Sequence, residues 1–530
     1  MNIFERKTII ENLAPSEEWD TIVIGGGATG LGVALDSVTR GYRTLLLEQV
    51  DFAKGTSSRS TKLVHGGVRY LAQGDLGLVR EALYERGLLA ANAAHLVKNQ
   101  SFIIPNYKWW GGMFYTIGLK VYDFLAGRLS LGESVHIGRS ETLRRAKTLK
   151  TNKLKGGVVY HDGQFDDSRL AVNLAQTCVE KGAAILNHFR VVQLLKDGQG
   201  AVCGVVGKDL ETNMEYRLHA KVVVNATGVF TDQILKMDDR RAKNMVRPSQ
   251  GIHLVVDRSF LPGEDAIMIP KTDDGRVLFL VPWHNRVLIG TTDTVLDDHS
   301  IEPVALEDEV DFIIGTANRY LSKSVSRKNV LSVFAGLRPL AAPQNGSEKT
   351  KEISRSHKIM VSKSNLVTIT GGKWTTYRKM AQDTIDSIIR MGILPKRKCV
   401  THNLGIHGST KDLFEDDHLT IYGSDRGGIL RLVEESPELG EKIHPNLEFI
   451  KAEVVWAARY EMARTVEDVL ARRVRILFLD AQASMEIAPI VAKILAAEMD
   501  MDLLWQEKQI SDFKAMANKY VLKETLNPAF

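Results

Sequence analysis

The stretch Thr21-Ile-Val-Ile-Gly-Gly-Gly-Ala-Thr-Gly30 decides the fold class of this chain. Its first four residues are typical of a short buried strand, and Gly25, Gly27 and Gly30 follow at the spacing G-x-G-x-x-G. In order, these glycines allow a tight turn, the approach of a pyrophosphate to the backbone, and close packing of the next helix on the strand. The N-terminus of that helix favours phosphates, because its N–H groups are free and its dipole end is positive.

A second strand completes the unit. Residues 31–40 have helical periodicity, Gly41 ends the helix, and residues 42–47 form the next strand. Glu48 follows at the end of that strand, where a carboxylate can bond to an adenosine ribose. Strand, turn, helix, strand and acid together predict a dinucleotide site in an α/β domain, but they do not separate NAD from FAD.

Bulk properties limit the class of protein without deciding it. At 530 residues the chain should hold two or three domains, and 44% hydrophobic and 25% charged residues are typical of a globular enzyme. No apolar run approaches the ~18 residues of a transmembrane helix, and no secretory signal is visible. Cys178, Cys203 and Cys399 show no metal-ligand spacing, so we expect reduced cysteines in the cytoplasm. Lys and Arg number 69 against 64 Asp and Glu, which fits anionic substrates or an anionic membrane face.

Residues 51–71 form an unusual polar and glycine-rich stretch. Its small hydroxyl side chains offer donors to a phosphate or a flavin ring, and Gly66 and Gly67 would let the backbone pass against a planar ligand. The alternative is a surface loop rich in turn formers. Because long loops in compact domains are uncommon unless they bind something, we favour a functional role. The hydroxyl residues are Thr56, Ser57, Ser58, Ser60 and Thr61, and the polar groups just beyond are His65, Arg69 and Tyr70.

Two later turns also have the residue types of a cofactor site. One predicted buried strand ends in the small-residue turn Ala226-Thr-Gly228, and another ends in Gly371 and Gly372 before a helix. Lys373 then stands where a cation is disfavoured, at the positive end of that helix. Its position becomes reasonable if an anion also binds there. This misfit is the clearest physical indication of a phosphate or carboxylate substrate.

The remaining segments indicate a second and a third domain. From about residue 246 to 336, β-branched residues alternate with polar ones, which predicts an antiparallel sheet. His253 lies in it, and a lone strand histidine is usually structural. Residues 107–125 are aromatic and flanked by basic residues, which fits either an interfacial membrane segment or an aromatic core helix. Past residue 405 the chain is helical, and we interpret the arginines of residues 459–475 as a solvated or salt-bridged face.

Four motifs carry a resemblance to a known family: Ser57–Tyr70, Ala335-Gly-Leu-Arg-Pro339, Gly371–Tyr377 and Glu461–Arg472. Together they resemble the FAD-dependent glycerol-3-phosphate dehydrogenases, a flavoprotein family that includes a related oxidase, over residues 18–520. The resemblance implies an α/β (α+β overall) chain of three parts. These are a glutathione-reductase-like FAD-binding Rossmann domain (18–90, 155–245 and 335–393), an antiparallel β substrate domain of the D-amino-acid-oxidase type (91–154 and 246–334), and a C-terminal helical domain (400–525).

The resemblance also implies a substrate site and a reaction. Arg69, Tyr70, His253, Arg338 and Lys373 should face the substrate, which fits the need of a phosphate dianion for several cations. The implied reaction is oxidation of sn-glycerol 3-phosphate to dihydroxyacetone phosphate, with the C2 hydride passing to flavin N5. The residues expected to contact FAD are Gly25, Gly27, Gly30, Glu48, Thr56, Ser57, Ser58, Thr61, Gly66, Gly67, Ala226, Gly228, Gly371, Gly372 and Lys373.

The sequence does not decide which residue is the base that takes the hydroxyl proton of the substrate. His65 and His253 are both candidates, since neutral imidazole titrates near the working pH. Lys373 or Arg338 would stabilise the reduced flavin.

The resemblance favours the bacterial type, which passes electrons to a membrane quinone from the inner face of the membrane. No EF-hand pattern is present, so no metal is expected, and the chain is too short for the extra insertion of the oxidase branch. We expect no nucleic-acid partner, and the oligomeric state is left open, a homodimer included. The alternatives are an oxidase that reduces oxygen to hydrogen peroxide, an amine or amino-acid oxidase, and a non-catalytic dinucleotide sensor.

Overall fold

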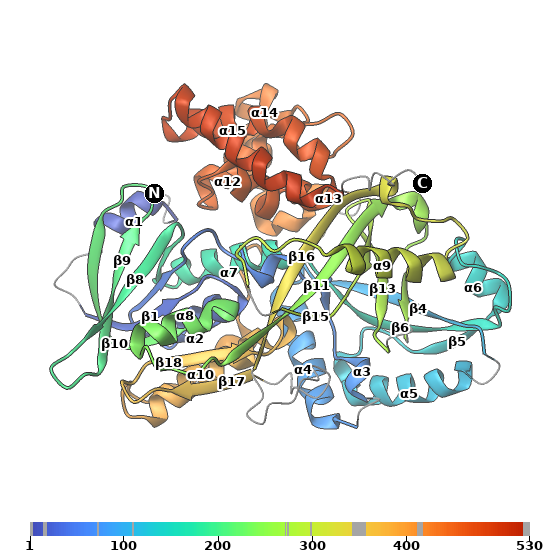
Figure 1. Ribbon diagram of the computed structural model, residues 1–530, viewed down its shortest axis with the longest axis horizontal. Helices are drawn as coiled ribbons and strands as arrows, with labels where there is room; N and C mark the ends of the chain where they lie inside the picture. Colours follow the sequence, from blue (N-terminus) through green and yellow to red (C-terminus); the bar gives the residue numbers. More distant parts are fainter. Residues whose placement is uncertain are drawn as a thin grey trace, which may run out of the picture.

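The computed structural model describes residues 4–13, 18–71, 74–108, 111–270, 272, 275–296, 299–341, 357–410 and 417–522. Within these ranges the chain forms two β-sheets side by side, with the C-terminal helices across one edge of both (Figure 1). No helix in these ranges is long and apolar enough to span a membrane.

The first sheet contains the dinucleotide unit, and its central strands are parallel. Its order among the described residues is β17-β18-β10-β1-β2-β7, and β8 and β9 continue from β10 as an antiparallel extension. β1 lies between β10 and β2 and is parallel to both. The strands are β1 (Trp19–Ile24), β2 (Thr44–Leu47), β7 (Ala184–Leu186), β8 (Phe189–Lys196), β9 (Val202–Asp209), β10 (Glu215–Asn225), β17 (His357–Val361) and β18 (Val367–Gly371).

Helices α2 (Ala28–Thr39), α7 (Asp167–Glu180) and α10 (Tyr377–Arg390) cover this sheet, with α2 packed between the other two. Leu31, Val33 and Leu35 of α2 are almost fully buried. A helix of small and aliphatic residues can pack on both sides in this way, and its N-terminus is thereby held at the end of β1. The predicted unit over residues 21–48 is therefore confirmed.

The second sheet is antiparallel except where β12 and β4 pair. Its order among the described residues is β15-β11-β14-β13-β12-β4-β6-β3, with β16 on β11 and β5 on β6. Helix α9 (Glu307–Tyr320) packs against β11 and β14. The strands are β3 (Leu63–Val64), β4 (Lys98–Asn106), β5 (Val135–Gly138), β6 (Gly156–Gln164), β11 (Val246–Asp257), β12 (Ala266–Ile269), β13 (Leu278–Trp283), β14 (Arg286–Gly290), β15 (Thr294–Val295) and β16 (Val330–Ala341).

Three strands from the segments assigned to the FAD-binding domain lie in the second sheet. We assigned residues 18–90, 155–245 and 335–393 to that domain, but β3 pairs with β6, β6 with β4, and β16 with β11. The physical reason is pairing over the whole strand, because β6 pairs with β4 from Gly156 to Gln164. The exact division into domains stays a prediction.

The other helices include a group that lies on one side of the molecule. α3 (Val68–Leu71), α4 (Leu76–Asn92) and α5 (Gly111–Ala126) pack together beside the sheets. α4 ends at Asn92, and β4 begins six residues later at Lys98. The remaining α-helices are α1 (Arg6–Glu11), α6 (Arg139–Arg145), α8 (Thr231–Asp238), α11 (Arg426–Glu435), α12 (Lys451–Tyr460), α13 (Ile476–Leu479), α14 (Ala481–Met499) and α15 (Leu503–Ala517).

An arginine cluster, Arg472, Arg473 and Arg475, joins the C-terminal helices to the rest of the chain. All three side chains are at most 2% exposed. Arg473 holds both carboxylate oxygens of Asp51, at 2.9 and 3.1 Å, and Arg475 donates to Asp167 at 3.0 Å. Of the two expected alternatives, a solvated or a salt-bridged face, these three arginines take the second, and they are buried because their partner acids Asp51 and Asp167 lie on another part of the fold.

Removing the Arg473 charge should destabilise the protein strongly. Burial disfavours the ionised Asp51, but the charges of Arg473 and Arg472 outweigh it and lower the pKa of Asp51. Arg473→Met leaves that buried carboxylate only partly compensated, so we expect a loss of about 3 kcal/mol of unfolding free energy, measured from denaturant midpoints.

Arg459→Met is the matched control, because Arg459 is 45% exposed and pairs with Glu498. Its effect should stay below about 1 kcal/mol. Equal effects of the two substitutions would contradict a structural role for the arginine cluster.

Candidate active site

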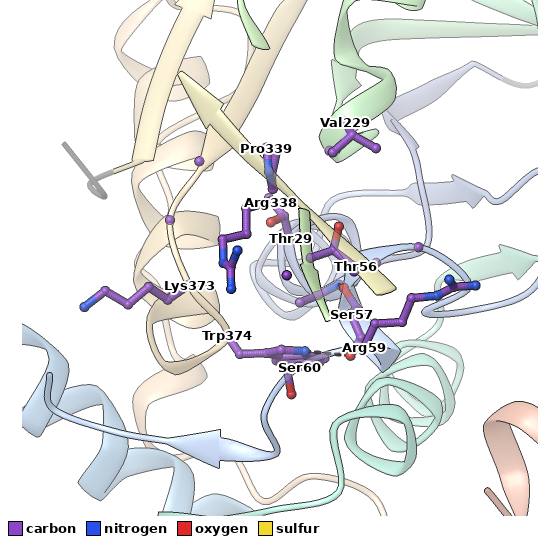
Figure 2. A pocket seen from close by; sticks show the side chains of 18 of the residues that line it. Thr29, Thr56, Ser57, Arg59, Ser60, Val229, Arg338, Pro339, Lys373 and Trp374 are labelled. Atoms are coloured by element: carbon purple, nitrogen blue, oxygen red, sulfur yellow. Dashed lines mark hydrogen bonds between the residues drawn. The ribbon is translucent and has the colours of Figure 1, made fainter. Parts of the chain in front are cut away.

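One large cavity of about 740 Å³ lies where the two sheets meet. The parallel strands β1, β2, β10 and β18 all end at it, so that Gly25, Glu48, Ala226 and Gly371 converge from four strand ends. Ligands bind α/β sheets at this position, where neighbouring connections leave the sheet in opposite directions. The opposite wall comes from β11 and β16 of the second sheet. Figure 2 shows this wall and the loop around Ser57 on two sides of the cavity.

The turn after β1 has the geometry of a pyrophosphate cradle. Gly25 has φ +109°, and a Cβ there would lie 2.7 Å from the carbonyl oxygen of Ala226. A Cβ at Gly27 would lie 3.1 Å from Ser57 Oγ, which accepts the N–H of Ala28 at 2.9 Å. Only glycine leaves the backbone open at these positions. The residues present therefore fit the phosphates of a dinucleotide.

Glu48 holds this turn in addition to facing the cavity. Its carboxylate accepts the N–H of Gly26 at 2.6 Å and that of Val50 at 2.9 Å. Burial raises the pKa of Glu48, and these two bonds oppose the rise. The acid at the end of β2 therefore holds the turn after β1, and its expected bond to an adenosine ribose stays a prediction.

Gly25→Ala should weaken binding of the dinucleotide. The added Cβ meets backbone, and a non-glycine residue at positive φ carries strain of about 1–3 kcal/mol, so binding of FAD, the dinucleotide expected from the sequence, should fall roughly tenfold or more. The ratio of flavin absorbance to protein measures this. Gly315→Ala on α9 is the control, because a Cβ there meets nothing within 4 Å. Full flavin content in the Gly25 variant would show that the nucleotide binds elsewhere.

The loop between Thr56 and Thr61 forms a fixed wall of the cavity. Trp374 Nε1 donates to the carbonyl of Ser57 at 2.8 Å, and Thr56 Oγ1 donates to Leu337 at 2.5 Å. Asp167 accepts both the N–H and the hydroxyl of Ser60, at 3.0 and 2.7 Å. The loop is therefore bonded to β16, to α7 and to the turn before α10, which supports the functional interpretation of this stretch.

Arg338 brings a cation into the cavity from the second sheet. Its Nη2 donates to Thr291 Oγ1 at 3.1 Å, and its Nη1 lies 3.5 Å from Asp293. Gly251 on β11 makes room for it, since a Cβ there would overlap the guanidinium. Figure 2 shows Arg338 pointing into the space between the turn at Lys373 and Thr56, whereas the chain of Lys373 extends away from that loop. Both residues line the cavity, but Arg338 is the one directed at its centre.

His253 is a buried neutral imidazole in the wall of the same cavity. Its ring stacks on Phe334 with centroids 4.9 Å apart, and its Nε2 lies 2.9 Å from Thr61 Oγ1. Burial lowers the pKa of His253 well below the usual value, and the charges of Lys62 and Arg338 lower it further. Its Nδ1 is buried and has no hydrogen-bond partner among the described residues. A buried ring nitrogen without a partner is uncommon, and this one belongs to a residue that lines the cavity.

The other predicted site residues divide into three groups. His65 also lines the cavity, as do Thr56, Ser57, Thr61, Gly67, Gly228, Gly371 and Gly372. Gly30, Ser58 and Gly66 do not. The side chains of Arg69 and Tyr70, and the residues Trp109 and Trp110, lie outside the described part of the chain.

The three exceptions have roles in packing. Gly30 packs against the carbonyl of Gly25, and a Cβ at Gly66 would meet Leu83 and Tyr122. Ser58 is buried, and its carbonyl accepts from Lys62 at 2.7 Å.

Sequence reasoning missed several charged residues at the cavity. Lys54 and Arg59 line it and both bind Glu302, at 2.5 and 2.6 Å. Arg276 also lines it. Arg59 stands inside the Ser57–Tyr70 motif, which was an available signal, but its partner lies 243 residues away. Arg276 follows no motif, so nothing in the sequence marks it.

The fold and the glycine cradle define an FAD-dependent oxidoreductase. Residues 20–378 match the family model described as FAD dependent oxidoreductase, and residues 362–509 match the C-terminal domain of alpha-glycerophosphate oxidase. The chain belongs to the FAD-dependent glycerol-3-phosphate dehydrogenase family, and FAD is its cofactor.

Three relatives support this assignment. The chain is 40% identical to a probable mitochondrial glycerol-3-phosphate dehydrogenase of Caenorhabditis elegans, over 95% of this chain and 74% of that protein. It is also 40% identical to a mitochondrial glycerol-3-phosphate dehydrogenase of Arabidopsis thaliana, over 97% and 88%. The structure of the Bacillus halodurans glycerol-3-phosphate dehydrogenase complexed with FAD superimposes with a TM-score of 0.80 at 29% identity, and 98% of each chain is covered. The family and the three-part fold expected from the sequence are thereby confirmed.

Proposed function

We propose that this protein oxidises sn-glycerol 3-phosphate to dihydroxyacetone phosphate and passes the electrons to a membrane quinone. The observation that carries the proposal is one cavity that is lined both by a pyrophosphate cradle and by the cation of Arg338. The cradle suits the adenine-side phosphates of FAD, and the cation suits a phosphate on the substrate. The family relationship supports the same substrate.

Arg338 binds the phosphate of the substrate in this proposal. A guanidinium offers two parallel N–H donors to phosphate oxygens, and Thr291 and Asp293 hold this one in place. Lys373 adds a second positive charge to the cavity wall. Fixing the phosphate end fixes the position of the C2 hydroxyl relative to His253.

His253 takes the proton of the C2 hydroxyl. FAD, when bound, accepts the hydride from C2. For Nδ1 to accept the proton, Nε2 must carry the ring hydrogen and donate it to Thr61 Oγ1, which also sets the ring orientation. The low pKa of His253 keeps the ring neutral and ready to accept. His65 is the alternative base, because it lines the same cavity.

The electron acceptor separates this proposal from an oxidase. In air and without quinone, the FAD-loaded protein should turn over glycerol 3-phosphate slowly and form little hydrogen peroxide. A soluble quinone should restore rapid turnover. Rapid peroxide formation without quinone would instead favour the oxidase, and rapid oxidation of an amine or amino acid would favour the third alternative.

We also propose that α5 rests on a membrane, where quinones are dissolved. Five apolar side chains of α5 face solvent: Met113 (71% exposed), Phe114 (63%), Ile117 (62%), Val121 (42%) and Phe124 (83%). Leu119 and Tyr122 on its other face are buried. An amphipathic helix with its apolar face outward is typical of interfacial attachment, and it favours the membrane interpretation of residues 107–125 over a core helix. Fractionation at low and high salt tests the attachment, and a protein found wholly in the supernatant at both would contradict it.

A further inference from the structure

A second hollow, of about 990 Å³, opens between α4 and α10 and is strongly basic. We call it the basic groove. Its third wall is the segment of residues 396–402 that follows α10. Its charged lining residues are Arg40, Arg378, Lys379, Arg390, Lys396, Arg397 and Lys398 against Glu81, Glu85 and Asp386.

Most of the acids in the basic groove are already neutralised. Glu85 holds Arg378 through two bonds of 2.8 and 2.6 Å, and Asp386 binds Arg40 at 2.6 Å. In contrast, Lys396, Lys398 and Arg390 form no ion pair with any residue that the structure describes. The groove therefore keeps a positive charge that no acid in the described part of the chain pairs with.

The lysines are held at the groove by a fixed piece of backbone. Arg397 donates to the carbonyls of Arg40 and Gly41 at the C-terminal end of α2, at 2.9 and 2.5 Å. Arg40 in turn donates to the carbonyl of Arg397 at 3.0 Å, and the guanidinium of Arg397 lies 5.0 Å from the ring of Tyr42. Lys396 and Lys398 flank this anchored residue. A basic run on a free tail would lack such bonds.

The basic groove and the apolar face of α5 share α4 as a common neighbour. Val79 and Leu83 of α4 pack against Tyr122 of α5, while Tyr84 of the same helix lines the groove and is 49% exposed. Figure 1 shows α10, α4 and α5 along one edge of the molecule, with α12, α14 and α15 at the opposite edge. The groove and the apolar face therefore lie on neighbouring helices along the same edge of the molecule.

We propose that the basic groove binds the phosphate of an anionic lipid headgroup when α5 lies on the membrane. This assignment rests on the membrane contact proposed above. Apolar insertion and attraction of basic residues to anionic lipids act together in peripheral attachment, and each lysine near such a surface contributes about 1 kcal/mol. The groove would select anionic over neutral lipid and fix the orientation of the protein on the bilayer.

The test compares Lys396→Gln/Lys398→Gln with Lys493→Gln/Lys514→Gln, which removes the same charge from exposed positions on α14 and α15. Binding of the FAD-loaded protein is measured on vesicles of phosphatidylcholine with and without phosphatidylglycerol. The groove variant should bind phosphatidylglycerol vesicles roughly ten- to thirtyfold more weakly than the wild type. The control variant should bind them like the wild type, and pure phosphatidylcholine should not distinguish the three proteins.

Equal binding of phosphatidylglycerol vesicles by the groove variant and the control would overturn the proposal. If the groove variant lost binding of inorganic phosphate but bound vesicles like the wild type, the groove would be a site for a soluble anion. That result would overturn the proposed lipid site. Oxidation of glycerol 3-phosphate with a soluble acceptor is measured alongside and should be the same in all three proteins. Failure of that reaction in the wild type would reject the proposed reaction and leave the vesicle result standing.

Discussion

His253→Asn should lower kcat for glycerol 3-phosphate by roughly 100- to 10 000-fold, the usual contribution of a general base. Asparagine keeps a polar side chain next to Thr61 but cannot take a proton from the C2 hydroxyl. The loss should therefore appear in kcat, with retention of flavin and a much smaller change in KM. Steady-state kinetics with a soluble acceptor measures it.

The pH dependence provides a second readout of the same residue. Because burial and two neighbouring cations lower the pKa of His253, its neutral form persists from the usual imidazole range upward and is lost only as the pH falls well below about 6.5. We therefore expect kcat/KM to show no imidazole step above that pH in the wild type. His219→Asn, at an exposed position on β10, is the control and should leave kcat/KM and its pH dependence unchanged. If His65→Asn lost kcat and His253→Asn did not, His65 would be the base.

Arg338→Ala should lower kcat/KM for glycerol 3-phosphate by about 100- to 1000-fold. Truncating one member of a buried, hydrogen-bonded charge pair costs about 2–5 kcal/mol, and here the other member would be the substrate phosphate. The kcat/KM of Arg338→Lys should lie between those of the wild type and Arg338→Ala, since an ammonium keeps the charge but loses the two parallel donors of the guanidinium. Steady-state kinetics over a range of substrate concentrations gives the ratio.

Arg144→Ala on α6 is the matched control for Arg338, because the Arg144 side chain is 71% exposed and pairs only with Glu141 in the described structure. It should change kcat/KM less than twofold. A wild-type kcat/KM in Arg338→Ala would place the substrate phosphate at another cation, and Lys373 would be the next to replace.

The nucleotide-binding half of the fold was predictable because its signals are local. The glycine spacing after β1 predicts which backbone positions must be open, and Gly25 and Gly27 both line the cavity. Strand partners far along the chain were not predictable from the same evidence. β16 looked like a return to the first domain, yet its register against β11 places Arg338 opposite Ser249 in the second sheet.

The side chains of the candidate site were likewise only partly predictable from the sequence. Gly30, Ser58 and Gly66 belong to the expected motifs, but a motif does not state which side of the chain faces the ligand. Buried charges are harder still to predict from sequence, because their partners are remote in the chain. Arg473 binds Asp51, which lies 422 residues away. The arginines therefore resembled a surface face, although they lie in the interior.

Anaerobic mixing of the FAD-loaded protein with glycerol 3-phosphate tests the central claim most directly. The flavin absorbance should bleach, with one dihydroxyacetone phosphate formed for each flavin reduced, and the Arg338→Ala and His253→Asn variants should bleach far more slowly. Glycerol and simple amines should leave the absorbance unchanged on the same timescale. An oxidised flavin that persists with glycerol 3-phosphate, or one that bleaches with an amine instead, would contradict the account.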